Sequence, residues 1–233
     1  MIKTPDLLFN ELVKNFPHQP TFAQKELLIQ LSSFVFDKNE RALFLVKGYA
    51  GTGKTTIIST LVNNLWRAGF KSVMMAPTGR AAKVIANYSG KQAFTIHKKI
   101  YFPQKSRSGG VNFTLQQNRH TNTIFIIDEA SMIPDRNPDA KLFDSSSLLD
   151  DLILYAYSGK NCKIIFVGDT AQLPPVKLEL SPALDKSTIS YNFLKDVVEV
   201  ELDEVMRQHQ NSGILANATK LRSIIQERSN ETF

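Results

Sequence analysis

The 233-residue sequence contains a single cysteine, Cys162, and no long run of apolar residues. One cysteine excludes an intrachain disulfide and a zinc site built from several cysteines, and it fits a reducing compartment. No segment approaches the ~18 apolar residues that a membrane-spanning helix needs. The chain also lacks internal repeats and low-complexity tracts. We therefore expect a soluble, cytoplasmic protein without a membrane partner, in which Cys162 is a small buried apolar residue.

Charge and hydrophobicity narrow the class of protein further. The composition is 42% hydrophobic, which is enough for a large core in one α/β domain or in a domain with an insertion. Lys and Arg number 28 against 22 Asp and Glu, giving a formal net charge of +6. This excess favours a polyanion such as nucleic acid as partner, although many basic proteins bind none.

Short apolar runs alternate with helical patterns along the chain. Apolar residues at helical spacing occupy "LLFNELVKNF" and "KELLIQLSSFVF" within residues 1–40, and later "GRAAKVIANYS" and "SLLDDLILYAYS". Strands are predicted over "ALFLVKG", "SVMMA", "TIFIID", "KIIFVGD" and "VVEVEL". This alternation is typical of an α/β fold with a central parallel sheet covered by helices on both faces. Such sheets bind ligands where their strands end, and polar residues recur at those ends here.

One segment interrupts the alternation. Residues 98–118 read as two polar strands around a Ser-Gly-Gly turn, which predicts a small inserted β-hairpin. We expect its aromatic residues, Tyr101, Phe102 and Phe113, to be exposed or packed on one another. An ordinary surface excursion would have the same pattern.

A glycine-rich loop follows the first predicted strand and precedes a helix. "GYAGTGKTT" matches G-x-x-x-x-G-K-[ST] in the setting that this phosphate-binding motif requires. Its backbone N–H groups would face phosphate oxygens, Lys54 would reach the β and γ phosphates, and the Thr55 hydroxyl would bind Mg²⁺. The alternative is a glycine-rich turn that matches by chance. We expect the nucleotide to contact Gly48, Gly51, Thr52, Gly53, Lys54, Thr55 and Thr56.

An acidic pair ends a later strand. In "IFIIDEAS", Asp128 would hold hydrated Mg²⁺ and Glu129 would orient and deprotonate the attacking water. Adjacent carboxylates at a strand end also cap helices or lie in solvent. Together with the upstream loop, however, they indicate hydrolysis of a nucleoside triphosphate. No N-K-x-D sequence is present to select guanine, so ATP is the expected nucleotide.

Several motifs in series resemble one family. "PTFAQ", "GYAGTGKTT", "APTGRAAKV", "FTIH", "IIDEASMI", "VGDTAQLPPV" and "EVMRQ" occur in the order found in superfamily 1 helicases of the RecD/Dda type (superfamily 1B), from about Pro20 to Gln208. The resemblance implies the N-terminal, RecA-like motor domain of an ATP-dependent DNA helicase, with 5′ to 3′ polarity. It also implies ATP and Mg²⁺ as cofactors, and single-stranded DNA and duplex junctions as partners.

The resemblance assigns three further residues to the nucleotide. Gln24 matches the glutamine that recognises adenine, although Thr21-x-x-Gln24 is also a capping box and the side chain suits either task. Gln172 matches the residue that senses the γ-phosphate and connects the nucleotide site with the DNA-binding segments. The alternative is that its loop is only a rigid turn. Arg207 matches an arginine that neutralises charge on the transferred phosphoryl group, as against a solvated arginine after a strand.

The same resemblance implies DNA contacts. "APTGRAAK" and "FTIH" correspond to segments that touch single-stranded DNA, and the 98–118 hairpin falls where these helicases carry a strand-separating pin. Arg80 and Lys83 otherwise make only a solvated cationic helix start, and a lone histidine in a polar loop is often without such a role. The expected DNA contacts are Pro77, Thr78, Arg80, Thr95, His97 and Phe102.

These motifs divide the chain into segments. We expect N-terminal helices over 1–40, a RecA-like ATPase domain over 41–97 and 119–210, the hairpin over 98–118, and the start of a second RecA-like domain over 211–233. A chain of this length cannot hold the whole second domain, so a longer, monomeric parent is expected, with weak activity in this part alone. The alternatives are a noncatalytic, RecD-like nucleic-acid-binding subunit of a nuclease complex, and a P-loop kinase or GTPase.

Overall fold

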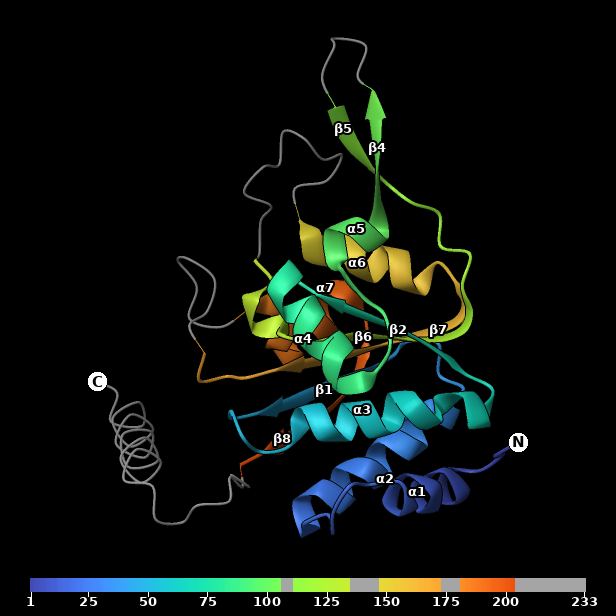
Figure 1. The fold of residues 1–233 in the computed structure, drawn as a ribbon. Helices are drawn as coiled ribbons and strands as arrows, with labels where there is room; N and C mark the ends of the chain where they lie inside the picture. Colours follow the sequence, from blue (N-terminus) through green and yellow to red (C-terminus); the bar gives the residue numbers. More distant parts are fainter. Residues whose placement is uncertain (106–110, 135–146, 173–180, 204–233) are drawn as a thin grey trace.

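The structure is a computed structural model that describes residues 1–105, 111–134, 147–172 and 181–203. Its helices and strands alternate along the chain as the apolar pattern predicts (Figure 1). They are α1 (Pro5–Lys14), α2 (Phe22–Phe36), β1 (Ala42–Gly48), α3 (Lys54–Asn64), η1 (Leu65–Ala68), β2 (Lys71–Ala76), α4 (Gly79–Ser89), β3 (Ala93–Thr95), α5 (Ile96–Ile100), β4 (Tyr101–Lys105), β5 (Val111–Leu115), β6 (Thr121–Ile127), η2 (Ala130–Met132), α6 (Leu148–Tyr157), β7 (Lys160–Gly168), η4 (Pro182–Leu184), α7 (Lys186–Phe193) and β8 (Asp196–Leu202).

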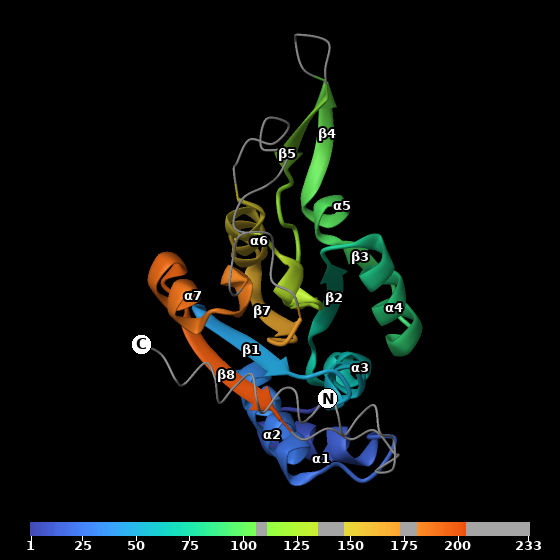
Figure 2. The same cartoon turned by 90° about the vertical axis from the view of Figure 1, so that its left-hand side faces the viewer.

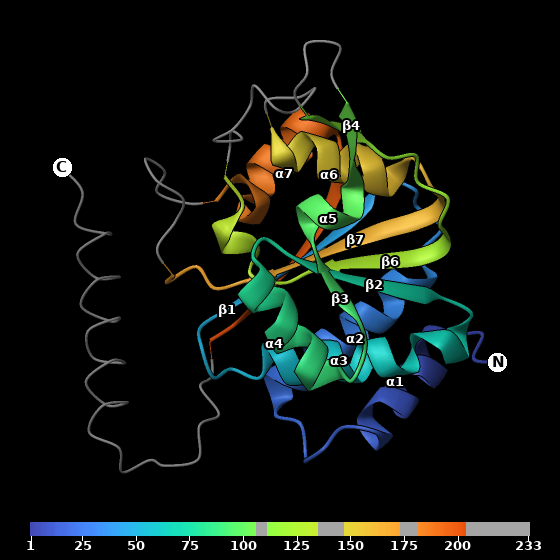
Figure 3. The same ribbon diagram turned by 45° about the horizontal axis from the view of Figure 1, so that its top comes forward.

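Six of these strands form one parallel sheet in the order β3-β2-β6-β7-β1-β8. Figure 3 shows β2, β6 and β7 side by side in its centre. The α/β prediction is therefore confirmed, and β3, α5 and α7 are additions that the apolar pattern did not reveal. All carboxyl ends of these strands meet at one edge of the sheet, which is the edge where ligands bind in such folds.

Both faces of the sheet are covered, so each strand contributes to two cores. In β1, Phe44 and Val46 pack with α1, α2 and α3, whereas Leu43 and Leu45 pack with α6 and α7. Helices α1, α2 and α3 lie below the sheet in Figure 1, and α5, α6 and α7 lie above it. This two-sided burial explains why the strands read as continuous apolar runs instead of alternating patterns.

Helix α2 is tied to the sheet at its C-terminal end. The side chain of Lys163 in β7 is buried, and its Nζ donates hydrogen bonds to the carbonyl oxygens of Phe34, at 2.7 Å, and Asp37. A cation at this position gives carbonyls at the C-terminal end of the helix a charged donor and complements the helix dipole. The contact fixes α2, whose N-terminal end carries Gln24.

The hairpin of β4 and β5 projects away from the sheet beyond α5 and α6 (Figure 2). Of the two alternatives for the aromatic residues, exposure is wrong for Tyr101, because it is buried in the core, where Phe113 packs against the same cluster, and its hydroxyl donates a 2.5 Å hydrogen bond to Asp151 in α6. Burial and this hydrogen bond raise the pKa of Tyr101. The Ser-Gly-Gly turn lies outside the described residues.

The structure shows where the single cysteine lies. Cys162 is buried in β7, as its apolar character predicts. No helix within the described ranges is long and apolar enough to cross a membrane. The predicted domain limits stay predictions, and the start of the second RecA-like domain at 211–233 lies outside the described residues.

Candidate nucleotide site

Most of the residues predicted to bind the nucleotide come together at the carboxyl edge of the sheet, which faces the viewer in Figure 2. A cavity of about 400 Å³ opens there between the loops that follow β1, β6 and β7. Its lining includes the glycine-loop residues Ala50, Gly51, Gly53, Lys54, Thr55 and Thr56, the acidic residues Asp128, Glu129 and Asp169, and Gln24 and Gln172. Residues far apart in the sequence thus form one polar cavity.

The loop after β1 needs glycine at two positions. Gly53 directly precedes α3 with φ +91°, and a Cβ there would lie 2.5 Å from Gln24 Nε2. Gly48 has φ +157°, and its Cβ would lie 2.6 Å from the carbonyl oxygen of Leu202. A side chain at either position would clash as well as strain the backbone. The loop therefore delivers the N-terminal end of α3, with its exposed N–H groups, to the cavity.

Lys54 lies in the first turn of α3 and folds back over the loop. Its Nζ donates hydrogen bonds to the carbonyl oxygens of Gly48, at 2.5 Å, and Tyr49, at 2.8 Å. Burial lowers the pKa of Lys54, while the negative charges of Asp169, Asp128 and Glu129 oppose that shift. The ammonium group therefore stands between the loop and a cluster of carboxylates.

The carboxylates opposite Lys54 come from two neighbouring strands. Burial, followed by the charge of Glu129, raises the pKa of Asp128 to about 6, and Lys54 acts in the other direction. Glu129 adopts a left-handed backbone conformation with φ +55°, which is uncommon for a residue other than glycine and is typical of functional sites. Asp169 accepts a 2.8 Å hydrogen bond from the backbone N–H of Ala171, which fixes the loop after β7.

Gln172 connects the last two loops. Its Oε1 accepts a 3.1 Å hydrogen bond from the hydroxyl of Ser131, three residues after Asp128 in the sequence. Because an amide carries its donors and its acceptor on different atoms, this contact occupies Oε1 and does not involve the donor Nε2. Ser131 was not singled out in the sequence, although it belongs to the same "DEAS" stretch.

Gln24 satisfies the capping-box alternative in full. The backbone N–H of Thr21 donates to its Oε1 at 3.1 Å, and the Thr21 hydroxyl accepts from the backbone N–H of Gln24 at 3.3 Å. Its Nε2 also donates to the carbonyl oxygen of Thr52 at 3.1 Å, and the residue is 1% exposed. Gln24 therefore braces the glycine loop from α2, and its contact with adenine stays a prediction.

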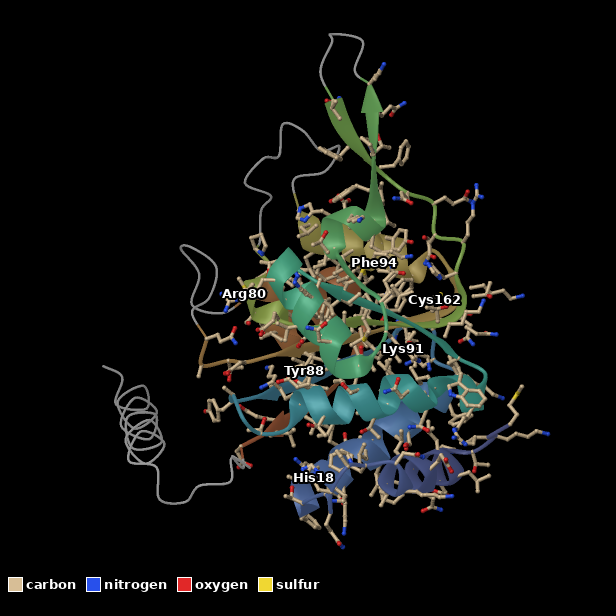
Figure 4. All side chains as sticks on the ribbon, in the orientation of Figure 1. His18, Arg80, Tyr88, Lys91, Phe94 and Cys162 are labelled. Atoms are coloured by element: carbon tan, nitrogen blue, oxygen red, sulfur yellow. The ribbon has the colours of Figure 1, made fainter. Side chains whose placement is uncertain are left out.

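Two aromatic residues that the sequence did not single out also line this cavity. His18 lies on the α1–α2 side of α3 and Tyr88 on the α4 side, as labelled in Figure 4. His18 stacks on Phe16, with ring centroids 5.0 Å apart. Among the predicted phosphate contacts, Thr52 is turned inward, because its hydroxyl donates to the carbonyl oxygen of Tyr49 at 2.9 Å.

The predicted DNA contacts lie beside this site and along the hairpin. A smaller cavity of about 230 Å³ is lined by Thr78 and Arg80 and shares Asp128, Glu129 and Gln172 with the nucleotide cavity. Pro77 is half-buried just before Thr78. Thr78 also caps α4 by accepting from the backbone N–H of Ala81, at 3.2 Å, a role that was not predicted from the sequence.

The remaining contacts predicted from the resemblance come from β3, α5 and the hairpin. Thr95 caps α5 by accepting from the N–H of Lys98, and the ring of His97 lies 5.9 Å from that of Tyr101. Phe102 on β4 is 42% exposed. Arg207 lies outside the described residues.

The chain is similar in sequence to a known domain family and to two DNA helicases. The family model described as an AAA domain matches residues 35–228. The ATP-dependent DNA helicase dda of Enterobacteria phage T4 is 32% identical over 190 residues, covering 80% of this chain and 39% of that protein. The ATP-dependent RecD2 DNA helicase of Deinococcus radiodurans is 29% identical over 158 residues, covering 67% and 19%. The chain thus spans less than half the length of these relatives.

Solved structures share the fold. The Pif1 helicase from Candida albicans aligns with 87% of this chain and 44% of its own, with a TM-score of 0.54 and 22% identity. The Pif1 helicase from Bacteroides in complex with ADP-AlF3 and ssDNA aligns with 86% and 45%, with a TM-score of 0.50 and 19% identity. At these identities the likeness shows the arrangement of the sheet and helices.

Proposed function

Because the chain belongs to the AAA domain family, we propose that it is the ATP-hydrolysing motor domain of a DNA helicase of the RecD/Dda type. The relatives named as ATP-dependent DNA helicases, dda and RecD2, support this proposal. One observation carries it: the nucleotide cavity and the cavity beside Arg80 share Asp128, Glu129 and Gln172. The residues that we propose for ATP hydrolysis therefore lie beside the residues that we propose for DNA binding.

The glycine loop and α3 would hold the triphosphate. The N–H groups at the start of α3 and the positive end of its dipole favour phosphate oxygens. Lys54 would exchange its contacts with the Gly48 and Tyr49 carbonyls for the β and γ phosphates. Thr55 and Thr56, in the same turn, line the cavity beside it. Gln24 and His18 line the same cavity, and the proposed contact of Gln24 with adenine would replace one of its hydrogen bonds to Thr21 or Thr52.

The oxygen donors at the carboxyl edge suit Mg²⁺. The hydroxyl of Thr55 and the carboxylate of Asp128 line the same cavity, and hard oxygen ligands are those that Mg²⁺ prefers. Burial and the charge of Glu129 raise the pKa of Asp128, and a bound cation would favour its ionised form. Bound Mg²⁺ would neutralise charge on the phosphates.

Glu129 is the proposed general base. It borders both cavities beside Asp128, and its left-handed backbone turns its side chain away from the direction that the strand would give it. From there it would orient a water molecule in line with the γ phosphate and accept its proton. Arg207 would neutralise charge that develops on the transferred group.

Gln172 is the proposed link between hydrolysis and movement. With Oε1 held by Ser131, its Nε2 can donate to a γ-phosphate oxygen and loses that partner after hydrolysis. A contact that differs between two nucleotide states is what any coupling requires. Thr78 and Arg80 line the same small cavity as Gln172. A change in the contact between Gln172 and the nucleotide would therefore alter how these two residues bind DNA.

Single-stranded DNA and duplex junctions are the proposed substrates, with 5′ to 3′ movement. Thr78 and Arg80 follow β2 and Thr95 is the last residue of β3, so all three lie near the carboxyl edge of the parallel sheet. Pro77 and His97 adjoin them, and Phe102 lies on the hairpin that would separate the strands. A second RecA-like domain beyond this chain would complete the motor, which we propose acts as a monomer.

The test is ATP hydrolysis with and without single-stranded DNA, compared between the wild type, Lys54→Ala and the control Lys38→Ala, whose lysine is exposed. Lys54→Ala should lower kcat by at least ~10²-fold, because it removes a charge that stabilises the transition state. DNA should stimulate the wild type and Lys38→Ala, and added salt should weaken that effect.

Unchanged turnover in Lys54→Ala would contradict the assignment of the phosphate site. If hydrolysis is intact but no nucleic acid stimulates it, a P-loop kinase or another NTPase is favoured over a motor. If DNA binds but no ATP is hydrolysed, a noncatalytic subunit of a nuclease complex is favoured. A protein that includes the proposed second domain should unwind duplexes with a 5′ tail and not those with a 3′ tail.

A further inference from the structure

A second polar cavity lies at the base of the hairpin, away from the nucleotide. It has a volume of about 520 Å³ and is lined by Lys99, Phe102, Gln116, Gln117, Arg119 and His120, with Tyr155 of α6 behind them. These residues come from the end of α5, the start of β4 and the connection between β5 and β6. We call it the hairpin-base cavity. No role proposed above involves its basic residues.

The topology places this cavity on the other side of the hairpin from Thr78, Arg80 and Thr95, the predicted DNA contacts at the carboxyl edge, whereas Phe102 lies on the hairpin itself. The chain enters the hairpin after Thr95, at the carboxyl edge of the sheet, because β3 runs parallel to β2. It leaves through residues 116–120 and begins β6 at the amino edge, where Thr121 pairs with Lys160. Figure 4 shows Arg80 and Cys162 at opposite sides of the molecule, and Cys162 contacts the carbonyl of His120. The hairpin therefore rises between two separate polar surfaces.

The hairpin-base cavity carries the positive charges of Lys99 and Arg119, and Lys99 Nζ lies 5.1 Å from the centroid of the Phe94 ring. Within the described parts of the chain, no ion pair involves Lys99 or Arg119. Burial lowers the pKa of His120, and the positive charges of Lys99 and Lys71 lower it further. Lys160 is exposed at the same edge. Burial and the charges of Lys99 and Lys71 disfavour the protonated form of His120, so the cations that an anion would meet in the cavity are Lys99 and Arg119.

The walls of the cavity are held by hydrogen bonds. Asn118 donates through Nδ2 to the carbonyl oxygens of Tyr155 and Ala156, at 2.9 and 3.0 Å, and accepts from the N–H of His120 at 2.8 Å. Gln116 donates from its backbone to the carbonyl of Ile100 and from its side chain to that of Tyr101. The cations therefore stand on a connection that is fixed to α5 and α6, which limits the ordering cost of binding.

We propose that the hairpin-base cavity binds the second DNA strand, the one that the hairpin displaces from the strand held at the carboxyl edge. Lys99 and Arg119 contact its phosphates, and the exposed ring of Phe102 stacks on a base at the point of separation. Cations beside an aromatic ring are the means by which proteins hold a single strand without reading its sequence. This inference rests on the proposed helicase function and adds a path for the second strand.

The test measures DNA binding by fluorescence anisotropy with two forked substrates. One duplex carries a single tail, and the other carries two non-complementary tails. The wild type should bind the two-tailed duplex several-fold more tightly. Lys99→Gln/Arg119→Gln should reduce that ratio to about one, whereas the control Lys3→Gln/Lys14→Gln, with two exposed lysines near or in α1, should keep it. The slope of log Kobs against log[salt] for the two-tailed duplex should also fall by ~1.4, for two lost single-strand phosphate contacts.

Crosslinking supplies a second measurement that needs no variant. A photoreactive base in the second tail should crosslink to the peptide Ile100–Lys105, which contains Phe102. An equal affinity of the wild type for both substrates, a ratio that survives Lys99→Gln/Arg119→Gln, or crosslinks confined to residues 77–97 would each overturn the inference. Those results leave the proposed function intact if single-stranded DNA still stimulates hydrolysis. Failure to bind any nucleic acid would remove both.

Discussion

The hydroxyl of Tyr101 offers a sharp test of how the hairpin is anchored. Tyr101 is 5% exposed and Asp151 is 6% exposed, and their side chains meet at 2.5 Å between the first residue of β4 and α6. A hydrogen bond to a charged, buried group contributes about 1.5–3 kcal/mol to stability. Tyr101→Phe removes this bond and leaves the ring in place. We expect the free energy of unfolding to fall by about 2 kcal/mol.

Urea unfolding followed by circular dichroism measures this loss. With a slope of about 2 kcal/mol per M, the midpoint should fall by about 1 M. The matched control is Tyr155→Phe, because the hydroxyl of Tyr155 makes no hydrogen bond within the described residues while its ring is equally buried. That variant should lose less than about 0.5 kcal/mol, as expected of a site without such a contact.

A double-mutant cycle isolates the pair. Tyr101→Phe, Asp151→Asn and the double variant should show a coupling energy of about 1.5 kcal/mol or more, because the two groups touch. Hydrogen exchange of the β4 and β5 amides should also become faster in Tyr101→Phe. A coupling energy near zero, or equal losses in Tyr101→Phe and Tyr155→Phe, would refute the reasoning.

Three further predictions concern the nucleotide site. Asp128→Asn should be more stable than the wild type in chelator at pH 8, by up to about 3 kcal/mol, because a carboxyl whose folded pKa is raised from 3.8 to about 6 destabilises the fold once it is ionised. The wild type loses this stability as the pH rises from about 4 through about 6, so urea unfolding near pH 4 should show little difference, and a pH-independent difference would contradict the cause. Gly53→Ala should weaken nucleotide binding at least tenfold by calorimetry, because its Cβ would lie 2.5 Å from Gln24 Nε2; unchanged affinity would mean that the loop relaxes freely. Gln172→Ala should bind nucleotide normally but lose most of the stimulation of hydrolysis by DNA, and full stimulation would reduce this loop to a rigid turn.

Most of the fold was accessible from local patterns. The continuous apolar runs identified the strands because each is buried on both faces, and Thr21 marked the start of α2 because a capping box is a short-range signal. Strand β3 has only three residues, so it was too short to leave a pattern. The position of Tyr101 was missed because its partner, Asp151, is distant in sequence, and only the packing of α6 brings the two together.

The candidate site likewise contains residues that local patterns predicted and residues that they did not. Lys54, Asp128 and Glu129 were identified because each follows a strand, and a parallel sheet brings the strand ends to one edge. His18 and Tyr88 flank α3 through the packing of α1, α2 and α4, and nothing in their neighbouring residues indicates a ligand. The two proposed roles of Gln24 were alternatives in the sequence, whereas the structure adds a contact with Thr52 that joins the cap of α2 to the loop.

The carbonyl groups of the glycine loop compete with a phosphate for the ammonium group of Lys54. Its Nζ already donates to the carbonyls of Gly48 and Tyr49, so an arriving phosphate must displace two internal acceptors before it gains the lysine. The observed binding energy is then a difference between two sets of hydrogen bonds, as it is for a group that leaves water. Removing Lys54 abolishes both sets at once. The affinity lost in such a variant will therefore understate the strength of the contact between the lysine and the phosphate.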